Sequence, residues 1–172
     1  LQGLFSVIEQ LFGLQVRAVP DAETWHPDAH LFALHNADGQ LIGQFYLDLY
    51  ARQHKRGGAW MDDVRGRRRS ANGSLQTPVA YLICNFAAPV GDKPALFTHD
   101  EVITLFHECG HGLHHLLTTI DTLGVAGING VEWDAVELPS QLMENFCWEW
   151  DVVSNMARHV VHGSTLPREL FD

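Results

Sequence analysis

The stretch that decides the fold is residues 98–117, which read THDEVITLFHECGHGLHHLL. It opens with the pattern of a capping box, in which Thr98 and Glu101 satisfy each other's backbone N–H groups. Apolar residues then recur at helical spacing, at Val102, Ile103, Leu105, Phe106, Leu113, Leu116 and Leu117. The pattern predicts a long amphipathic helix that begins directly after Thr98.

The predicted helix carries the pentapeptide His107-Glu108-Cys109-Gly110-His111. Residues four apart on an α-helix are rotated by about 400°, so both imidazoles project from one face and can bind one metal ion. Glu108 lies about 100° from His107 and therefore beside that ion. It is placed to take a proton from a metal-activated water, which is the general-base role in a zinc peptidase.

A catalytic zinc ion keeps three protein ligands and one open position, so a third ligand is needed. The pattern in which a third histidine follows closely fails, because Leu117 stands where that histidine belongs. The remaining candidates are Glu132, Glu137 and Glu144. Glu137 ranks first, because it opens a predicted helix whose first turn accommodates Pro139.

Two acidic side chains could accept a hydrogen bond from the outer nitrogen of a ligand histidine, namely Glu144 and Asp134. A helix cap for Asp134 and a solvated face for Glu144 are equally favoured interpretations. His114 and His115 continue the histidine stripe, but they lie too far along the helix to join a tetrahedral site. We interpret both as supporting or structural residues.

Several stretches resemble the thimet oligopeptidase family of zinc metallopeptidases: FYLDLY at 45–50, KRGGAWM at 55–61, FTHDE at 97–101 and the run 107–144. The similarity spans most of residues 25–150. It implies an endopeptidase for short peptides that binds one zinc ion per chain. His107, His111 and Glu137 would be the ligands, and Glu108 the base.

Cys109 departs from the family, whose members usually carry phenylalanine there. It lies about 200° from His107 on the helix, so we expect a change of packing only. The family's oxyanion-stabilising histidine and tyrosines have no counterpart here. The chain also lacks an initiator methionine and stops within a helix-like turn, which predicts a fragment of a larger enzyme. The alternative function is a catalytically incomplete metal-binding or interaction module.

The order of elements predicts an α+β, zincin-like fold, in which a short antiparallel sheet precedes the metal-binding helices. It would form part of a larger, mainly helical peptidase. We expect one unit over residues 1–172, with an N-terminal helix and β-rich part at 1–95 and a helical zinc-binding part at 96–172. Segments 31–35 and 41–47 flank a turn and predict a hairpin. Segment 78–86 predicts a third strand.

The third strand is expected at a sheet edge by analogy with zinc peptidases, so that residues 80–85 would pair with an extended peptide. Three glycines in residues 124–130 favour either a mobile loop over the cleft or a plain connector.

Composition favours one globular core, since 46% of the 172 residues are hydrophobic. No apolar run approaches the roughly 18 residues of a spanning helix, so we expect no membrane partner. Three cysteines without disulfide or metal-ligand spacing favour a reducing, cytoplasmic location. A net charge of −10 argues against nucleic acid and leaves short peptides as the expected partners.

Seven of the 11 Lys and Arg residues lie within residues 52–69. A charge run of this kind is usually a solvated loop. The alternative is a surface that attracts acidic peptides or substrate carboxylates toward the cleft.

Overall fold

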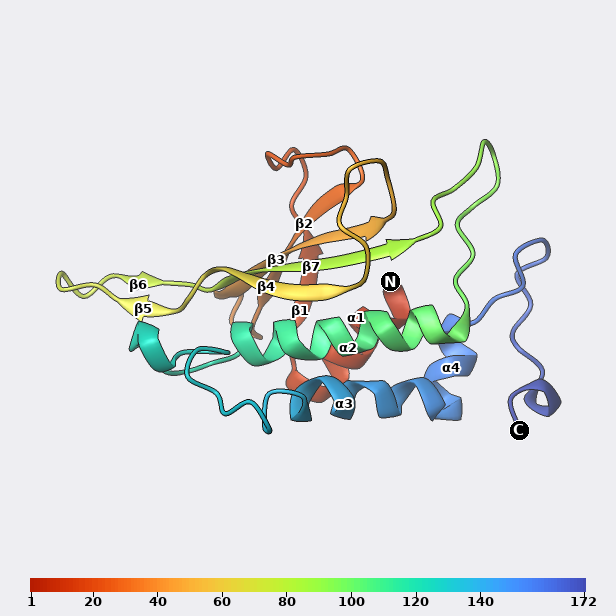
Figure 1. Ribbon diagram of the computed structural model, residues 1–172. Coiled ribbons are helices and arrows are strands. Elements are labelled where there is room, and N and C mark those ends of the chain that lie inside the picture. The colour runs from red at the N-terminus through yellow and green to blue at the C-terminus, as the bar shows by residue number, and fades with distance from the viewer.

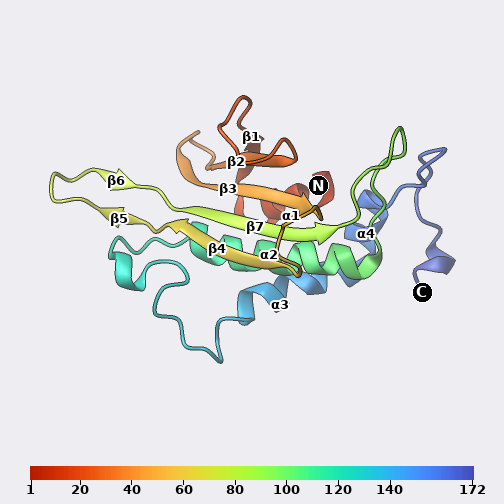
Figure 2. The same ribbon diagram turned by 45° about the horizontal axis from the view of Figure 1, so that its top comes forward.

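The computed structural model describes residues 1–172 as one principal sheet with helices beneath it (Figure 1). Two strands of a small second sheet project from its side (Figure 2). The elements in chain order are α1 (Gln2–Phe12), β1 (Gln15–Ala18), β2 (Ala29–His35), β3 (Leu41–Tyr50), β4 (Trp60–Arg65), β5 (Arg68–Arg69), β6 (Leu75–Gln76), β7 (Val79–Phe86), α2 (His99–Leu116), the 3₁₀ turn η1 (Leu123–Val125), α3 (Leu138–Asn145), η2 (Phe146–Trp148), α4 (Trp150–Met156) and η3 (Arg168–Leu170).

The principal sheet has the strand order β1-β2-β3-β7-β4. Three of its pairings are antiparallel, but β3 and β7 run parallel. The α+β class is therefore confirmed, whereas the expectation of a purely antiparallel sheet is wrong. Parallel neighbours need a long connection, and residues 51–78 provide it by forming β4 and the β5–β6 hairpin before the chain returns as β7.

The predicted hairpin is confirmed in β2 and β3, which pair around the turn that follows Asn36. The side chain of Asn36 accepts from the backbone N–H of Asp38 at 3.1 Å and of Gln40 at 2.8 Å. Gly39 adopts a φ of 77°, a conformation that glycine reaches without steric cost.

The predicted third strand forms as β7, but it lies inside the sheet between β3 and β4. The expectation of an edge strand at residues 80–85 is therefore wrong. A nearly continuous apolar run is typical of a strand covered on both faces, and six of the eight residues of β7 are buried. The edge strand beside α2 is β4, in which four of six residues are exposed.

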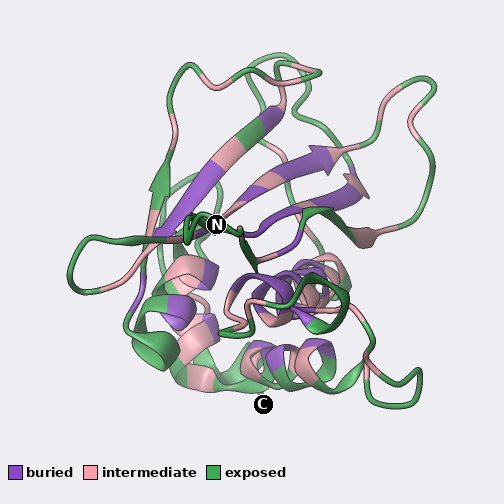
Figure 3. Ribbon diagram, turned by 90° about the vertical axis from the view of Figure 1, so that its left-hand side faces the viewer, coloured by how far each residue is buried: buried purple, intermediate pink, exposed green.

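The core lies between the sheet and helices α1 and α2, where the buried residues gather (Figure 3). Cys109 belongs to this core and is 2% exposed, which confirms the packing role expected of it. Helix α3 packs against α2 on the side away from the sheet (Figure 1). No helix is both long enough and apolar enough to cross a membrane.

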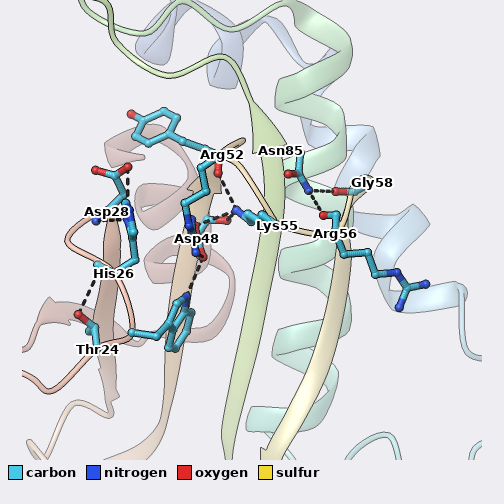
Figure 4. A network of polar contacts seen from close by, with 11 residues as sticks. Thr24, His26, Asp28, Asp48, Arg52, Lys55, Arg56, Gly58 and Asn85 are labelled. Atoms are coloured by element: carbon cyan, nitrogen blue, oxygen red, sulfur yellow. Dashed lines mark hydrogen bonds and ion pairs between the residues drawn. The ribbon is translucent and has the colours of Figure 1, made fainter.

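Four of the seven cations in the basic run at 52–69 are exposed, as a solvated loop predicts, and the other three are partly buried and ion-paired. Arg52 and Lys55 contact Asp48, and the Lys55 side chain is only 6% exposed (Figure 4). Arg67 and Arg69 both contact Asp121, at 2.7 and 2.8 Å. Each carboxylate neutralises one of its two cations, so each of these two clusters keeps one unit of positive charge. The attraction of acidic peptides to this surface stays a prediction.

Candidate metal centre

Helix α2 begins as the sequence predicts. Its N-cap is Thr98, whose hydroxyl accepts from the backbone N–H of Glu101 at 3.2 Å. The Glu101 carboxylate in turn accepts from the backbone N–H of Thr98 at 2.8 Å. The capping box is therefore confirmed, and it fixes the helical register of the histidines two turns and more downstream.

His107 and His111 lie one turn apart on α2, and their Nε2 atoms face each other at 3.2 Å. Glu137 reaches the same point from the start of α3. Its Oε2 atom lies 3.3 Å from Nε2 of His107 and 3.1 Å from Nε2 of His111. Three potential ligand atoms from two helices thus converge. These residues form the one group of three His, Cys, Asp or Glu side chains in the chain that could hold a metal ion.

The spacing of the three atoms fits a zinc ion. Two zinc–ligand bonds of about 2.0–2.2 Å that meet at a tetrahedral angle place their ligand atoms about 3.3–3.6 Å apart. The observed separations of 3.1–3.3 Å match the lower end of that range to within the tolerance of about 0.2 Å expected of a metal site. Two neutral imidazoles and one carboxylate are also a donor set that zinc accepts.

Glu137 is held by the first turn of its own helix. The hydroxyl of Ser140 lies 2.9 Å from the Oε2 atom of Glu137 and 2.8 Å from its backbone oxygen. Ser140 is fully buried, whereas the Glu137 side chain is 48% exposed, so the hydroxyl holds the carboxylate from the protein side. Pro139 occupies the first helical turn, where its missing N–H leaves no hydrogen bond unmade.

Gly110 allows α2 and α3 to approach closely enough for these ligands to meet. An ideal Cβ atom at this position would lie 2.6 Å from the oxygen of Pro139 and 2.6 Å from Cα of Ser140. Both are backbone atoms of α3, so no side-chain rotation could relieve the contact. Only glycine fits at this helix crossing.

Glu144 lies two turns beyond Glu137 and accepts a hydrogen bond from the outer nitrogen of His107. Its Oε1 atom is 2.6 Å from Nδ1 of His107. A carboxylate only accepts, so Nδ1 carries the proton and the Nε2 lone pair faces Glu137 and His111. Asp134, the alternative partner, is exposed and makes no such contact in the structure.

The environment of His111 also favours a free lone pair. Burial lowers the pKa of His111, although the carboxylate of Glu137 partly opposes this effect. A lowered pKa keeps the imidazole neutral at neutral pH. His111 therefore presents the form that binds a metal ion.

Glu108 is only 6% exposed and lies on the flank of α2 that faces strand β4. Burial raises the pKa of Glu108, and the charge of Glu137 adds to this shift; a protonated His107 would oppose it. The backbone of Met61, in β4, lowers the pKa in turn. Glu108 is thus beside the three converging atoms and is not one of them.

The other histidines of α2 stay outside the cluster. His115 is fully buried, and its Nε2 atom donates to the backbone oxygen of Arg65 at 3.0 Å, which ties the end of β4 to α2. His114 lines a cavity of about 680 Å³ between the ends of α2 and α3. None of the three converging residues lines that cavity, so it is separate from the candidate metal centre.

Two residues of the site escaped the sequence reasoning. Ser140 follows Glu137 by three residues, the spacing at which a hydroxyl can bond within a first helical turn. That spacing was the available signal. Gly110 carried no local signal, because its role depends on how closely a distant helix approaches.

Comparison with known proteins places the chain among peptidases. A profile of peptidase family M3 matches residues 1–172. The chain is 59% identical over 172 residues to oligopeptidase A of Escherichia coli (strain K12), and 46% identical over 176 residues to the organellar oligopeptidase A of Arabidopsis thaliana. It is 36% identical over 176 residues to the thimet-like oligopeptidase of Dictyostelium discoideum.

These three alignments cover 100%, 99% and 100% of the chain but only 25%, 22% and 26% of the relatives. The chain therefore spans about a quarter of their length. The family resemblance inferred from the sequence is confirmed by these matches.

Proposed function

Because the chain belongs to peptidase family M3, we propose that it provides the zinc-binding part of a metalloendopeptidase that hydrolyses short oligopeptides. The observation that carries the proposal is the convergence of His107, His111 and Glu137 at 3.1–3.3 Å, with Glu108 beside them. Structural zinc sites are closed by four Cys or His ligands and need no adjacent base. Three ligands and a carboxylate fit catalysis better.

A zinc ion at this site would polarise the scissile carbonyl and acidify a water molecule. Glu108 takes the proton of that water and later donates it to the leaving amine. Its raised pKa suits both steps, since a base with a pKa nearer to neutrality also returns a proton readily. Glu144 keeps the proton of His107 on Nδ1, and Ser140 orients Glu137.

The substrate-binding element in this proposal is the free edge of β4. This strand pairs only with β7, so its other edge has backbone N–H and C=O groups without a strand partner. An extended peptide can add to such an edge by main-chain hydrogen bonds. The edge lies beside Glu108. The edge strand β4, the helix α2 with its two histidines and the helix α3 that follows Glu137 together make up the zincin-like arrangement that we propose.

Elemental analysis of the purified chain, with His107→Ala as the control, tests the metal site. We expect about one zinc per chain, lost in the variant. A quenched fluorogenic oligopeptide then tests hydrolysis by the zinc-loaded chain. Absence of zinc from the wild-type chain would refute the metal centre, and zinc without cleavage would refute the hydrolytic role of the isolated chain.

The second candidate is a metal-binding module without catalysis of its own. It is favoured by one observation, that the chain spans about a quarter of the length of its relatives. Zinc bound at unit stoichiometry with no cleavage of any tested peptide is its expected result.

Two further expectations belong to this proposal. Residues 1–172 would form one piece of a catalytic domain, with its β-rich part at 1–95 and its zinc-binding helices at 96–172. A cytoplasmic location agrees with three cysteines that are all free and buried.

A further inference from the structure

His99, in the first turn of α2, joins that helix to the far end of α3. Its Nε2 atom lies 2.8 Å from the backbone oxygen of Cys147, in the 3₁₀ turn η2 that continues α3. A carbonyl oxygen only accepts, so Nε2 carries the proton and donates it. This is the one hydrogen bond between the first turn of α2 and η2, and the proposed hydrolysis does not use it.

The acceptor of this bond is buried, whereas the donor stands at the surface. Cys147 is 0% exposed and belongs to the core, while His99 is exposed. The ring of Trp148 meets the His99 ring edge to face, with centroids 4.6 Å apart. A buried backbone oxygen needs a hydrogen-bond partner, so His99 satisfies a group that water does not reach.

Two contacts fix α3 on α2, and the hydrogen bond that orients His107 lies between them. At one end, Gly110 of α2 packs against the backbone at the start of α3. At the other end, the bond from His99 holds the turn after α3. Glu144 lies between these two points and accepts from Nδ1 of His107 at 2.6 Å. Its place on α2 therefore depends on both attachments.

The length of α3 gives the size of the effect. Glu144 lies four residues beyond Ser140 and Cys147 lies seven, which at 1.5 Å per residue is about 6 and 10 Å from the helix crossing. If α3 pivots at the crossing, a displacement of about 1 Å at Cys147 moves Glu144 by about 0.6 Å. Its 2.6 Å contact with His107 would then lengthen to about 3.2 Å, the upper limit of an N–H···O hydrogen bond.

We propose that His99 is a positioning residue, whose hydrogen bond to the backbone after α3 keeps Glu144 within reach of Nδ1 of His107. Through that contact, His99 acts on the tautomer of a candidate zinc ligand without touching the metal centre. The effect on zinc binding rests on the proposed function. The effect on the tautomer is a property of the zinc-free chain.

Two substitutions at His99 separate its hydrogen bond from its ring. His99→Phe keeps an aromatic ring against Trp148 but has no N–H to donate. His99→Gln loses the ring, but its amide nitrogen lies about as far along the side chain as Nε2 and can donate to the same oxygen. Thr104→Ala is the matched control, because it removes a hydrogen bond of 2.9 Å from an α2 side chain to a backbone oxygen within α2 itself.

The imidazole nitrogen chemical shifts of the zinc-free chain report the tautomer of His107 at a fixed alkaline pH. The wild-type chain, His99→Gln and Thr104→Ala should keep the proton on Nδ1. His99→Phe should give a mixture of the Nδ1–H and Nε2–H forms, because a lengthened contact no longer selects one of them. A wild-type tautomer in His99→Phe, or the same mixture in His99→Gln, would overturn the inference.

Competition with a zinc chelator separates positioning from general stability. His99→Phe should weaken zinc binding up to about tenfold, the lower end of the 10–100-fold loss expected when the Glu144 carboxylate itself is removed. In the Glu144→Ala background, the same substitution should have no further effect, since no carboxylate remains to be positioned. A further loss of equal size would show that His99 stabilises the helix pair in general and would refute the positioning role.

Failure of this inference and failure of the proposed function are distinguishable. A wild-type chain that binds no zinc would refute the metal centre, while the tautomer of His107 in the zinc-free chain would still decide the role of His99. Because His99 is exposed, His99→Ala can take the place of His99→Phe if that variant does not fold.

Discussion

A methyl group added at Gly110 is expected to separate the two helices that carry the candidate ligands. The added Cβ atom would lie 2.6 Å from two backbone atoms of α3, one in Pro139 and one in Ser140. Optimal separations of non-bonded heavy atoms are about 3.5–4.0 Å, so α3 must retreat by roughly 1 Å. Glu137 immediately precedes α3 and would retreat with it.

The cost to metal binding follows from that displacement. Ligand distances tolerate deviations of about 0.2 Å, so a shift of roughly 1 Å takes the Glu137 carboxylate out of reach unless its side chain rearranges. With partial rearrangement, we expect zinc affinity to fall about 10–100-fold, or about 1.4–2.8 kcal/mol. Overpacking costs about 1–3 kcal/mol of unfolding free energy, against about 1 kcal/mol gained by replacing glycine with alanine in a helix.

Competition with a chromogenic zinc chelator measures this affinity, and Gly112→Ala is the matched control on the same helix. Its added Cβ atom would meet the Cδ2 atom of Leu82 at 2.8 Å, a side-chain atom of the core on the sheet side of α2 and not the backbone of α3. The control shares the gain in helix propensity but leaves α3 in place. Equal zinc affinities for Gly110→Ala and Gly112→Ala would refute the reasoning from the helix crossing.

Three further outcomes are expected. Glu108→Gln should keep zinc at about one per chain and lower kcat about 10²–10⁴-fold in peptide hydrolysis; full turnover would exclude Glu108 as the base. Glu144→Ala should weaken zinc binding about 10–100-fold by chelator competition, since it frees the His107 ring; unchanged affinity would contradict that role. Burial alone would raise the pKa of Asp48, but hydrogen bonds from Arg52, Lys55 and Trp25 outweigh it and hold that pKa well below its usual value. The stabilisation is therefore complete above the unfolded pKa of about 3.9 and is lost as pH falls below it. Urea unfolding across pH 3–6 should show a steeper acid loss for the wild-type chain than for Asp48→Asn, and parallel curves would contradict this.

The sequence predicted the elements whose signals are local. The capping box of Thr98 and Glu101 lies within four residues, and the turn after Asn36 within five, so both needed no knowledge of distant contacts. Glu137 could be ranked first because a helix start and its proline are also local features. Each of these depends on interactions between near neighbours in the chain.

The failures concern relations between segments far apart. Whether a strand is interior or at an edge depends on where residues 60–65 return, and nothing within residues 79–86 encodes that return except an unusually continuous apolar run. The same holds for Lys55. Its position within a basic run predicts solvation, but its partner Asp48 lies on the preceding strand and buries it. Contacts between distant segments therefore determine both the interior place of β7 and the burial of Lys55.

The faces of α2 explain why the pentapeptide is more restrictive than its candidate site residues His107, Glu108 and His111 alone. At about 100° per residue, His107 and His111 lie on the face that carries the candidate ligands, and Glu108 lies on the next flank, toward β4. Cys109 points into the core, and Gly110 meets the backbone of α3. Each position therefore serves a different neighbour, so the two positions between Glu108 and His111 cannot vary freely. The first tolerates apolar side chains that the core can hold. The second tolerates none, because Glu137, the candidate carboxylate ligand, stands at the start of the helix that a side chain there would displace.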